Sequence, residues 1–223
     1  MVFFDDLETR SGDERAAEIA DALPRQIARA KALGGYKTTL ADITAQDVNS
    51  AMALARLPVL RKSDLSQAQG AASPFGGFTT RTATGFGHIF QSPGPIYEPG
   101  GIEMDWWRMG RFLHACGIGS DDIVQNCFAY HLTPAGMIFE SGARAVGATV
   151  LPAGTGQTEL QVRAAVDIGA TAYAGTPDYL KVILDAADEM GETLHITKAA
   201  VGGGALFPSL RQEYADRGIA CLQ

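Results

Sequence analysis

The sequence of 223 residues is long enough for one large domain or two small ones, and its 46% hydrophobic and 19% charged content is ordinary for a globular protein. A net charge of −7 without a basic run argues against nucleic acid as a partner, because phosphate contacts need clustered Lys and Arg. The sequence also lacks a membrane-length apolar stretch, a secretion signal and a disulfide pattern among its three cysteines, so we expect a cytoplasmic protein with no membrane partner.

The first 75 residues are predicted to form a helical N-terminal segment. Residues 13–33 place apolar side chains on one helical face, and Pro24 is expected to kink or split that helix before Gly34-Gly35 ends it. Residues 44–56, with Thr44 as the cap, and a short segment from Ser63 onward also have helical patterns.

The composition changes between residues 71 and 101, where Gly, Pro, Thr and Ser dominate. This composition is typical of loops and short strands, and residues 85–90 are the best strand within it. Residues 103–116 return to a helical pattern with an apolar stripe.

From Asp122 onward, apolar runs of β type alternate with helical segments. The helical segments are 135–147, the segment after a Thr158–Gln161 capping box, 178–190 and the segment from Pro208; Thr133-Pro134 and Thr176-Pro177 are predicted helix starts. This alternation predicts an α/β subdomain over residues 76–223, with a mostly parallel sheet and helices on both faces. The five predicted strands are Ile123–Tyr130, Ala148–Pro152, Ala170–Gly175, Ile196–Val201 and Ile219–Leu222.

Ligands of such sheets bind outside the carboxyl ends of the strands, so a site is sought there. Residues 202–204 are three consecutive glycines at one such end, which either let a flat or anionic ligand approach the backbone or make a tight turn. Gly154-Thr155-Gly156 matches a dinucleotide motif only in part, and a plain turn explains it better. The four histidines lack the paired spacing of a zinc site, so no metal ligand is predicted. The aromatic and polar residues that end two other strands are Tyr130 and His131, and Thr176, Pro177 and Tyr179.

Several stretches, in this order, resemble phenylacetate–coenzyme A ligases and related adenylate-forming enzymes. They are Leu54–Leu65, Val124–Tyr130, Gly142–Pro152, Gly154–Glu159, Gly175–Leu180 and Gly202–Arg211. The resemblance covers the chain from about Leu23 onward and implies that it is the N-terminal portion of such an enzyme.

The resemblance implies a two-step reaction, in which a carboxylic acid is adenylated with Mg-ATP and the acyl group is then transferred to coenzyme A. It places the acid beside Tyr130, His131, Gly175, Thr176, Pro177 and Tyr179. It places the nucleotide beside Gly202, Gly203, Gly204, Ala205 and Leu206, and its phosphates beside Ser92 and Gly94. The implied cofactors are therefore ATP or AMP, Mg²⁺ and coenzyme A, and the implied partner is a small, possibly aromatic acid.

The chain departs from the family pattern in the loop at 91–101, which has three prolines and Glu98 but no threonine or lysine. The family's later motifs lie beyond Gln223, so we expect the chain alone to be inactive and its partner to be a second copy or a missing C-terminal portion. The alternative is a non-catalytic homologue that binds a ligand or a partner. Under either hypothesis, AMP is expected to bind about as well as ATP or better.

Overall fold

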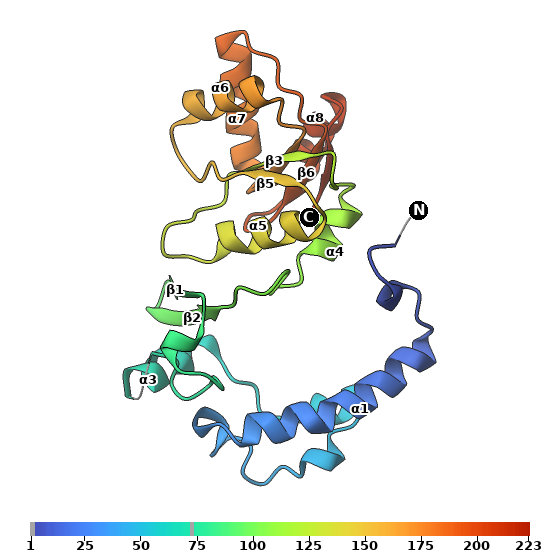
Figure 1. The fold of residues 1–223 in the computed structure, drawn as a ribbon, viewed down its shortest axis with the longest axis vertical. Coiled ribbons are helices and arrows are strands. Elements are labelled where there is room, and N and C mark those ends of the chain that lie inside the picture. The colour runs from blue at the N-terminus through green and yellow to red at the C-terminus, as the bar shows by residue number, and fades with distance from the viewer. Residues whose placement is uncertain (1–2, 72–73) are drawn as a thin grey trace. The chain divides into compact units, whose positions relative to one another are not determined.

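The computed structural model describes residues 3–71 and 74–223, and the chain divides into two compact units, Met1–Gly101 and Ile102–Gln223. Figure 1 follows the chain through both units. The division expected after residue 75 falls inside the first unit. Within the described ranges, the helices are all too short or too polar to cross a membrane.

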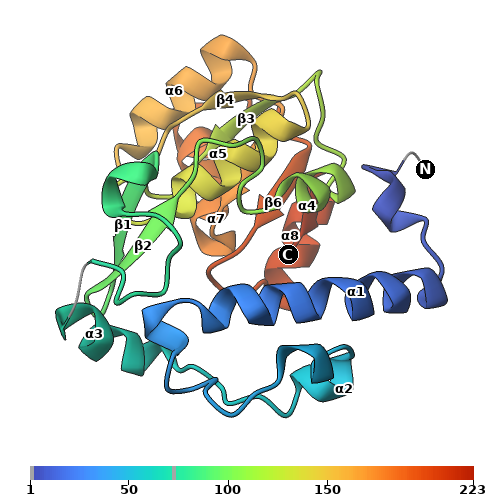
Figure 2. The same ribbon diagram turned by 60° about the horizontal axis from the view of Figure 1, so that its bottom comes forward.

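The first unit is mostly helical over residues 3–71, as predicted for the N-terminal segment, and then forms a hairpin. Helix α1, Gly12–Lys31, passes through Pro24 without interruption (Figure 2), so the expected split does not occur. The predicted helix over 44–56 is a 3-10 turn and one short α-helix instead. The other elements are η1 Asp6–Glu8, η2 Gly34–Tyr36, η3 Ala45–Asp47, α2 Ala51–Leu54, α3 Lys62–Ala71, η4 Ala83–Gly85, β1 His88–Ser92 and β2 Ile96–Gly100.

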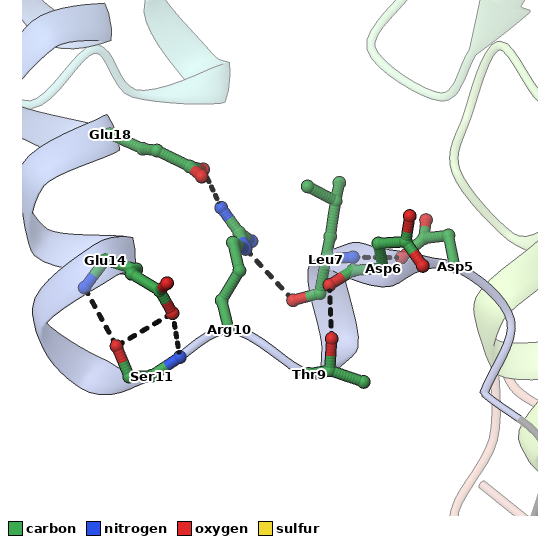
Figure 3. Close-up of polar contacts among 8 residues, drawn as sticks. All are labelled: Asp5, Asp6, Leu7, Thr9, Arg10, Ser11, Glu14 and Glu18. Carbon is green, nitrogen blue, oxygen red and sulfur yellow. Dashed lines mark hydrogen bonds and ion pairs between the residues drawn. The ribbon is translucent and has the colours of Figure 1, made fainter.

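A dense set of polar contacts fixes the start of α1 (Figure 3). The Ser11 hydroxyl accepts a hydrogen bond from the Glu14 amide at 3.2 Å, and the Glu14 carboxylate accepts from the Ser11 amide at 2.8 Å. This reciprocal pair is a capping box. Arg10 donates to the Leu7 carbonyl at 3.0 Å and forms an ion pair with Glu18. These two contacts of Arg10 join the preceding 3-10 turn to the helix.

Strands β1 and β2 form an antiparallel hairpin that lies beside α3 (Figure 1). The Gln69 side chain of α3 donates to the Tyr97 carbonyl and accepts from the Tyr97 amide, each at 2.8 Å. The Gln69 side chain therefore makes the two hydrogen bonds to the outer edge of β2 that a neighbouring strand would make at Tyr97. Pro95 and Pro99 lie two residues to either side of Tyr97 and have no amide hydrogen to offer.

The second unit contains the predicted parallel sheet, with strand order β4-β3-β5-β6-β7 and every pair parallel. All five predicted strands are confirmed, each shorter than its apolar run. The strands are β3 Ile123–Asn126, β4 Thr149–Leu151, β5 Ala172–Gly175, β6 Lys198–Val201 and β7 Ala220–Leu222. The helices are α4 Gly110–Ala115, α5 Ala135–Ala145, α6 Thr158–Ile168, α7 Pro177–Met190 and α8 Pro208–Asp216.

Side chains that alternate along each strand build two cores, one on each face of the sheet. Val124, Ala172 and Ala200 face α4 and α5, where they belong to one buried cluster with Leu113 and Phe139. The neighbouring positions, including Tyr173, Ala199 and Cys221, face α7 and α8. Figure 1 shows α5 and α7 on opposite sides of the strands, which confirms the predicted fold class.

Three expected helix starts in the second unit are wrong. Asp105 and Arg108 have φ angles of 51° and 59°, which a right-handed helix does not accept, so the helix predicted from 103 begins only at Gly110. Pro134 is the N-cap of α5 rather than its first helical residue. The capping box at Thr158 does not form, because Gln157 is the N-cap and the Gln161 side chain bonds to the preceding loop.

Candidate functional site at the carboxyl edge of the sheet

Backbone hydrogen bonds extend the sheet beyond the ends of its strands and hold the edge loops side by side. The Gly154 amide donates to the Asn126 carbonyl at 2.9 Å, and the Cys127 amide donates to the Ala174 carbonyl at 2.7 Å. The Gly202 amide donates to the Gly175 carbonyl at 3.1 Å. The loops that follow β4, β3, β5 and β6 therefore line one continuous edge, as expected for a ligand site of this fold.

The hydroxyl of Tyr130, which follows β3, is bound within the protein. The hydroxyl accepts from Asn126 Nδ2 at 2.8 Å and is hydrogen-bonded with Glu140. Burial, followed by the nearby Glu140 carboxylate, raises the pKa of Tyr130. Gly136 allows the ring to lie close, because a Cβ there would sit 2.8 Å from it. Tyr130 therefore stays protonated, with its hydroxyl held by Asn126 and Glu140.

The glycine loop after β6 lies over two aromatic rings. Phe128 and Phe139 stack at 4.1 Å with an interplanar angle of 27°. A Cβ on Gly203 would lie 3.7 Å from Phe128 and 3.7 Å from the Thr176 methyl, and Gly203 has a φ of 73° that favours glycine. Gly203 and Gly204 are exposed, so a flat group could approach the backbone from the solvent side.

Gln223 fixes the far end of that loop. Its side chain donates to the Gly204 carbonyl and accepts from the Leu206 amide at 3.0 Å. Ala205, between these two contacts, is exposed. The predicted nucleotide residues of the second unit therefore form one ordered turn. Sequence reasoning did not select Gln223, because its partners are remote in sequence.

The turn after β5 is rigid for reasons internal to the sheet. The Tyr173 hydroxyl donates to the Thr176 carbonyl at 3.0 Å, and Pro177 is buried at the start of α7. A Cβ on Gly175 would lie 2.1 Å from that hydroxyl, so only glycine fits. Gly175 thus has a packing role, and Thr176 is held at the edge.

The remaining predicted acid-binding residues do not point to one place. His131 is exposed, and its carbonyl accepts from the Thr133 amide at 2.7 Å. The Tyr179 hydroxyl donates to the Gly156 carbonyl at 3.3 Å, so Tyr179 supports the loop after β4. The edge proper is therefore formed by Tyr130, Thr176 and the glycine loop.

A buried polar cluster around Gln161 organises the loop after β4. Gln161 Nε2 donates to the carbonyls of Gly156 and Gly154, at 2.6 and 3.1 Å. Its Oε1 accepts from Cys127 Sγ at 3.2 Å and from Gln125 Nε2 at 3.3 Å. Gln125 Oε1 is buried without a partner. Gln125, a polar residue inside the apolar run of β3, could have indicated a buried polar cluster. Gln161 was instead predicted to take part in a helix cap.

Ser92 and Gly94, the predicted phosphate residues, lie on the hairpin of the first unit. The Ser92 hydroxyl donates to Glu98, which also faces Lys62 at 3.7 Å. Ser92 is buried. The hydroxyl expected to meet a phosphate is thus bound to a carboxylate.

The described residues hold no group of three or more His, Cys, Asp or Glu side chains that could bind a metal ion. The three cysteines are free and buried, and burial raises the pKa of Cys116 and of Cys127 to about 12. These thiols are structural rather than reactive.

The chain is similar in sequence to two phenylacetate–coenzyme A ligases. It is 29% identical over 163 residues to the protein of Aromatoleum evansii, a match covering 70% of this chain and 36% of that protein. It is 26% identical over 175 residues to the protein of Thermus thermophilus, covering 74% and 38%. The chain thus spans well under half the length of these relatives. No family model matches it.

Solved structures with the same fold include 2-hydroxyisobutyryl-CoA ligase. The chain superposes on its postadenylation state, in complex with R3-HIB-AMP, with a TM-score of 0.87 at 20% identity. The match covers 96% of this chain and 48% of that one. Another postadenylation structure of that ligase, in complex with 2-HIB-AMP, gives a TM-score of 0.86. At this identity the likeness shows the fold alone, and it extends over about half of that ligase.

Proposed function

We propose that this chain, whose sequence is similar to phenylacetate–coenzyme A ligases, is the acid- and adenylate-holding part of an acid–coenzyme A ligase. The observation that carries the proposal is the carboxyl edge, where the fixed turn at Thr176 and the exposed Gly203 lie close together beside the stacked Phe128 and Phe139 rings. A cytoplasmic location and any partner chain stay predictions.

The chemistry of the whole reaction would come from ATP with Mg²⁺, which supplies the adenylyl group, and from coenzyme A, which supplies the thiol. The residues of this chain would bind and orient the acid and the adenylate. The Tyr130 ring would limit the size of the acid, because its hydroxyl is already satisfied by Asn126 and Glu140. The Gly203 and Gly204 backbone, which is exposed, would lie against the adenine.

The hairpin of the first unit does not fit a triphosphate. Ser92 donates to Glu98, and a carboxylate beside phosphates is repulsive. Pro93, Pro95 and Pro99 supply no amide hydrogen. Each missing donor to a charged acceptor costs about 1.5–3 kcal/mol, so contacts to the β- and γ-phosphates should be weak.

This hairpin favours a second candidate function, that of a homologue that binds an acid or an adenylate without carrying out adenylation. The Ser92–Glu98 contact is the observation behind it. The two candidates share the carboxyl edge and differ in whether ATP reacts.

Calorimetry with AMP, ATP and phenylacetate tests the proposal. We expect AMP to bind at least as tightly as ATP, and Ala205→Trp to weaken AMP binding by crowding the exposed turn. Ala215→Trp, an equally exposed change on α8, should leave binding intact. ATP binding far tighter than AMP would show that the hairpin works as a phosphate loop. Failure of both AMP and phenylacetate to bind would refute the site.

A further inference from the structure

The first unit has a cavity of about 420 Å³, lined by residues of that unit. It lies among α3, the outer strand of the hairpin, and residues 75–79. Its apolar lining comes from Tyr36, Leu60, Leu65, Phe75, Phe78, Ile96, Tyr97 and Pro99. Phe75 and Ile96 are almost fully buried, so the floor of the cavity is a fixed part of the core. A volume of this order suits a small organic molecule.

Close backbone packing builds the aromatic wall of this cavity. Tyr36 and Phe78 meet edge to face, with ring centroids 4.9 Å apart at 84°. The Gly35 amide donates to the Gly77 carbonyl at 3.0 Å, and a Cβ on Gly35 would lie 2.6 Å from the Phe78 ring. The two chain segments therefore approach as closely as they can, and the rings are set in place by the backbone before any ligand arrives. Such rings present faces and edges suited to another aromatic ring.

Several polar groups around the cavity are already engaged with the protein. Gln69 pairs with the backbone of Tyr97, and the Thr79 hydroxyl donates to the Arg81 carbonyl at 2.9 Å. The two charges at the rim, Lys62 and Glu98, lie 3.7 Å apart and compensate each other. A ligand of either charge would be attracted by one of them and repelled by the other, and it would lose its hydration on entry.

We propose that this cavity binds a small, uncharged aromatic molecule. Its binding would come from burial of apolar surface against the aromatic wall and not from an ionic contact. The proposal concerns a site in the first unit alone, so it stands or falls independently of ligand binding at the carboxyl edge.

Three matched probes test the charge preference: 2-naphthol, 2-naphthoate and (2-naphthylmethyl)ammonium. Calorimetry should show that 2-naphthol binds, and that both charged probes bind roughly tenfold more weakly or worse, because each must leave water beside a compensated ion pair. Methyl chemical shifts of Leu65 and Ile96 in the labelled protein should move with 2-naphthol. Equal binding of the three probes, or shifts confined to the second unit, would overturn the proposal.

Two variants on different walls test the location. Leu65→Trp and Thr79→Trp should fill the cavity and weaken 2-naphthol binding roughly tenfold or more. Met52→Trp, an exposed position of α2 outside the cavity, should leave the affinity unchanged. Circular dichroism verifies folding of each variant. Unchanged affinity in a folded Leu65→Trp or Thr79→Trp protein would refute the assignment, and if neither variant folds, the probe selectivity and shift map of the unaltered protein decide.

Discussion

Lys198 binds both carboxylate oxygens of Asp122, at 2.9 and 2.8 Å, and so joins β6 to the residue that precedes β3. Thr171, just before β5, donates to the same carboxylate at 2.8 Å, and the Gly119 amide donates at 2.8 Å. Asp122 is only 5% exposed. One carboxylate therefore fixes the register of three neighbouring parallel strands at their amino ends.

Asp122→Asn should lower the free energy of unfolding by about 1.5–3 kcal/mol, because hydrogen bonds to a charged group contribute on that order. Lys198 is partly exposed and can still reach solvent, which keeps the cost below that of a fully buried pair. Urea unfolding of the two proteins measures the difference. Asp121→Asn, at the exposed neighbouring position, is the control and should be nearly neutral; an equal loss there would contradict the assignment.

The same carboxylate gives the fold a dependence on acid. Burial acts to raise the pKa of Asp122, but the bonds from Lys198, Gly119 and Thr171 outweigh it, so the pKa is lowered from 3.8. A depressed folded pKa means that the contribution is complete above the unfolded value and is lost as the pH falls through the folded value. The unaltered protein should therefore lose its advantage over Asp122→Asn only below about pH 4. A constant difference down to pH 2 would contradict this.

Gly175→Ala should destabilise the second unit by about 1–3 kcal/mol, because the new Cβ would overlap the Tyr173 hydroxyl. Thermal unfolding measures the effect. Gly119→Ala is the matched control, since a Cβ there meets nothing within 4 Å. If both variants melt at the same temperature, the packing role of Gly175 is refuted.

Gln161→Leu should free the loop after β4. The substitution removes the donor to the Gly154 and Gly156 carbonyls and the acceptor for Cys127, at a cost of about 1–3 kcal/mol for the buried groups left unpaired. Hydrogen exchange at residues 154–157 should accelerate more than exchange in α7. Arg163→Ala, at an exposed position of the same helix, is the control and should change exchange neither at residues 154–157 nor in α7. Faster exchange at residues 154–157 in this control would show that a disturbed helix α6, and not the loss of the Gln161 side-chain amide, is responsible.

The cysteines should react slowly with an aromatic disulfide reagent at neutral pH. Burial raises the pKa of Cys116 and Cys127 to about 12 and that of Cys221 to about 11, and the thiolate is the reactive form. All three should react at once in denaturant, which serves as the internal control. Fast reaction of one thiol in the native protein would show that its segment opens.

The sheet was predictable because each buried strand is a short apolar run bounded by turns and followed by a helix. The predicted strands were too long where side-chain polar contacts replace the backbone hydrogen bonds between strands. In β3, for example, the Asn126 side chain donates to the Gly136 carbonyl and the Tyr130 hydroxyl where the strand ends. One helix start failed because a side chain had a partner outside the helix. Thr158 and Gln161 have the spacing of a capping box, but the loop carbonyls hold Gln161 instead.

The candidate site was predictable only in outline. The strand ends named Tyr130, Thr176 and the glycine loop, because parallel strands gather their carboxyl ends at one edge. The stacked Phe128 and Phe139 beneath them were missed, since apolar residues in a core have no signal of their own. The Ser92–Glu98 contact was likewise invisible, because it depends on the register of the hairpin.

Gln69 of α3 and two prolines leave few backbone groups of β2 open for hydrogen bonding, and this affects aggregation at high protein concentration. A strand from another molecule can add to a sheet only where it finds alternating donors and acceptors. Along β2 the Tyr97 groups are occupied by Gln69, and Pro95 and Pro99 have no donor. This strand cannot act as a template for intermolecular β-structure, so fibril growth would have to begin elsewhere in the chain.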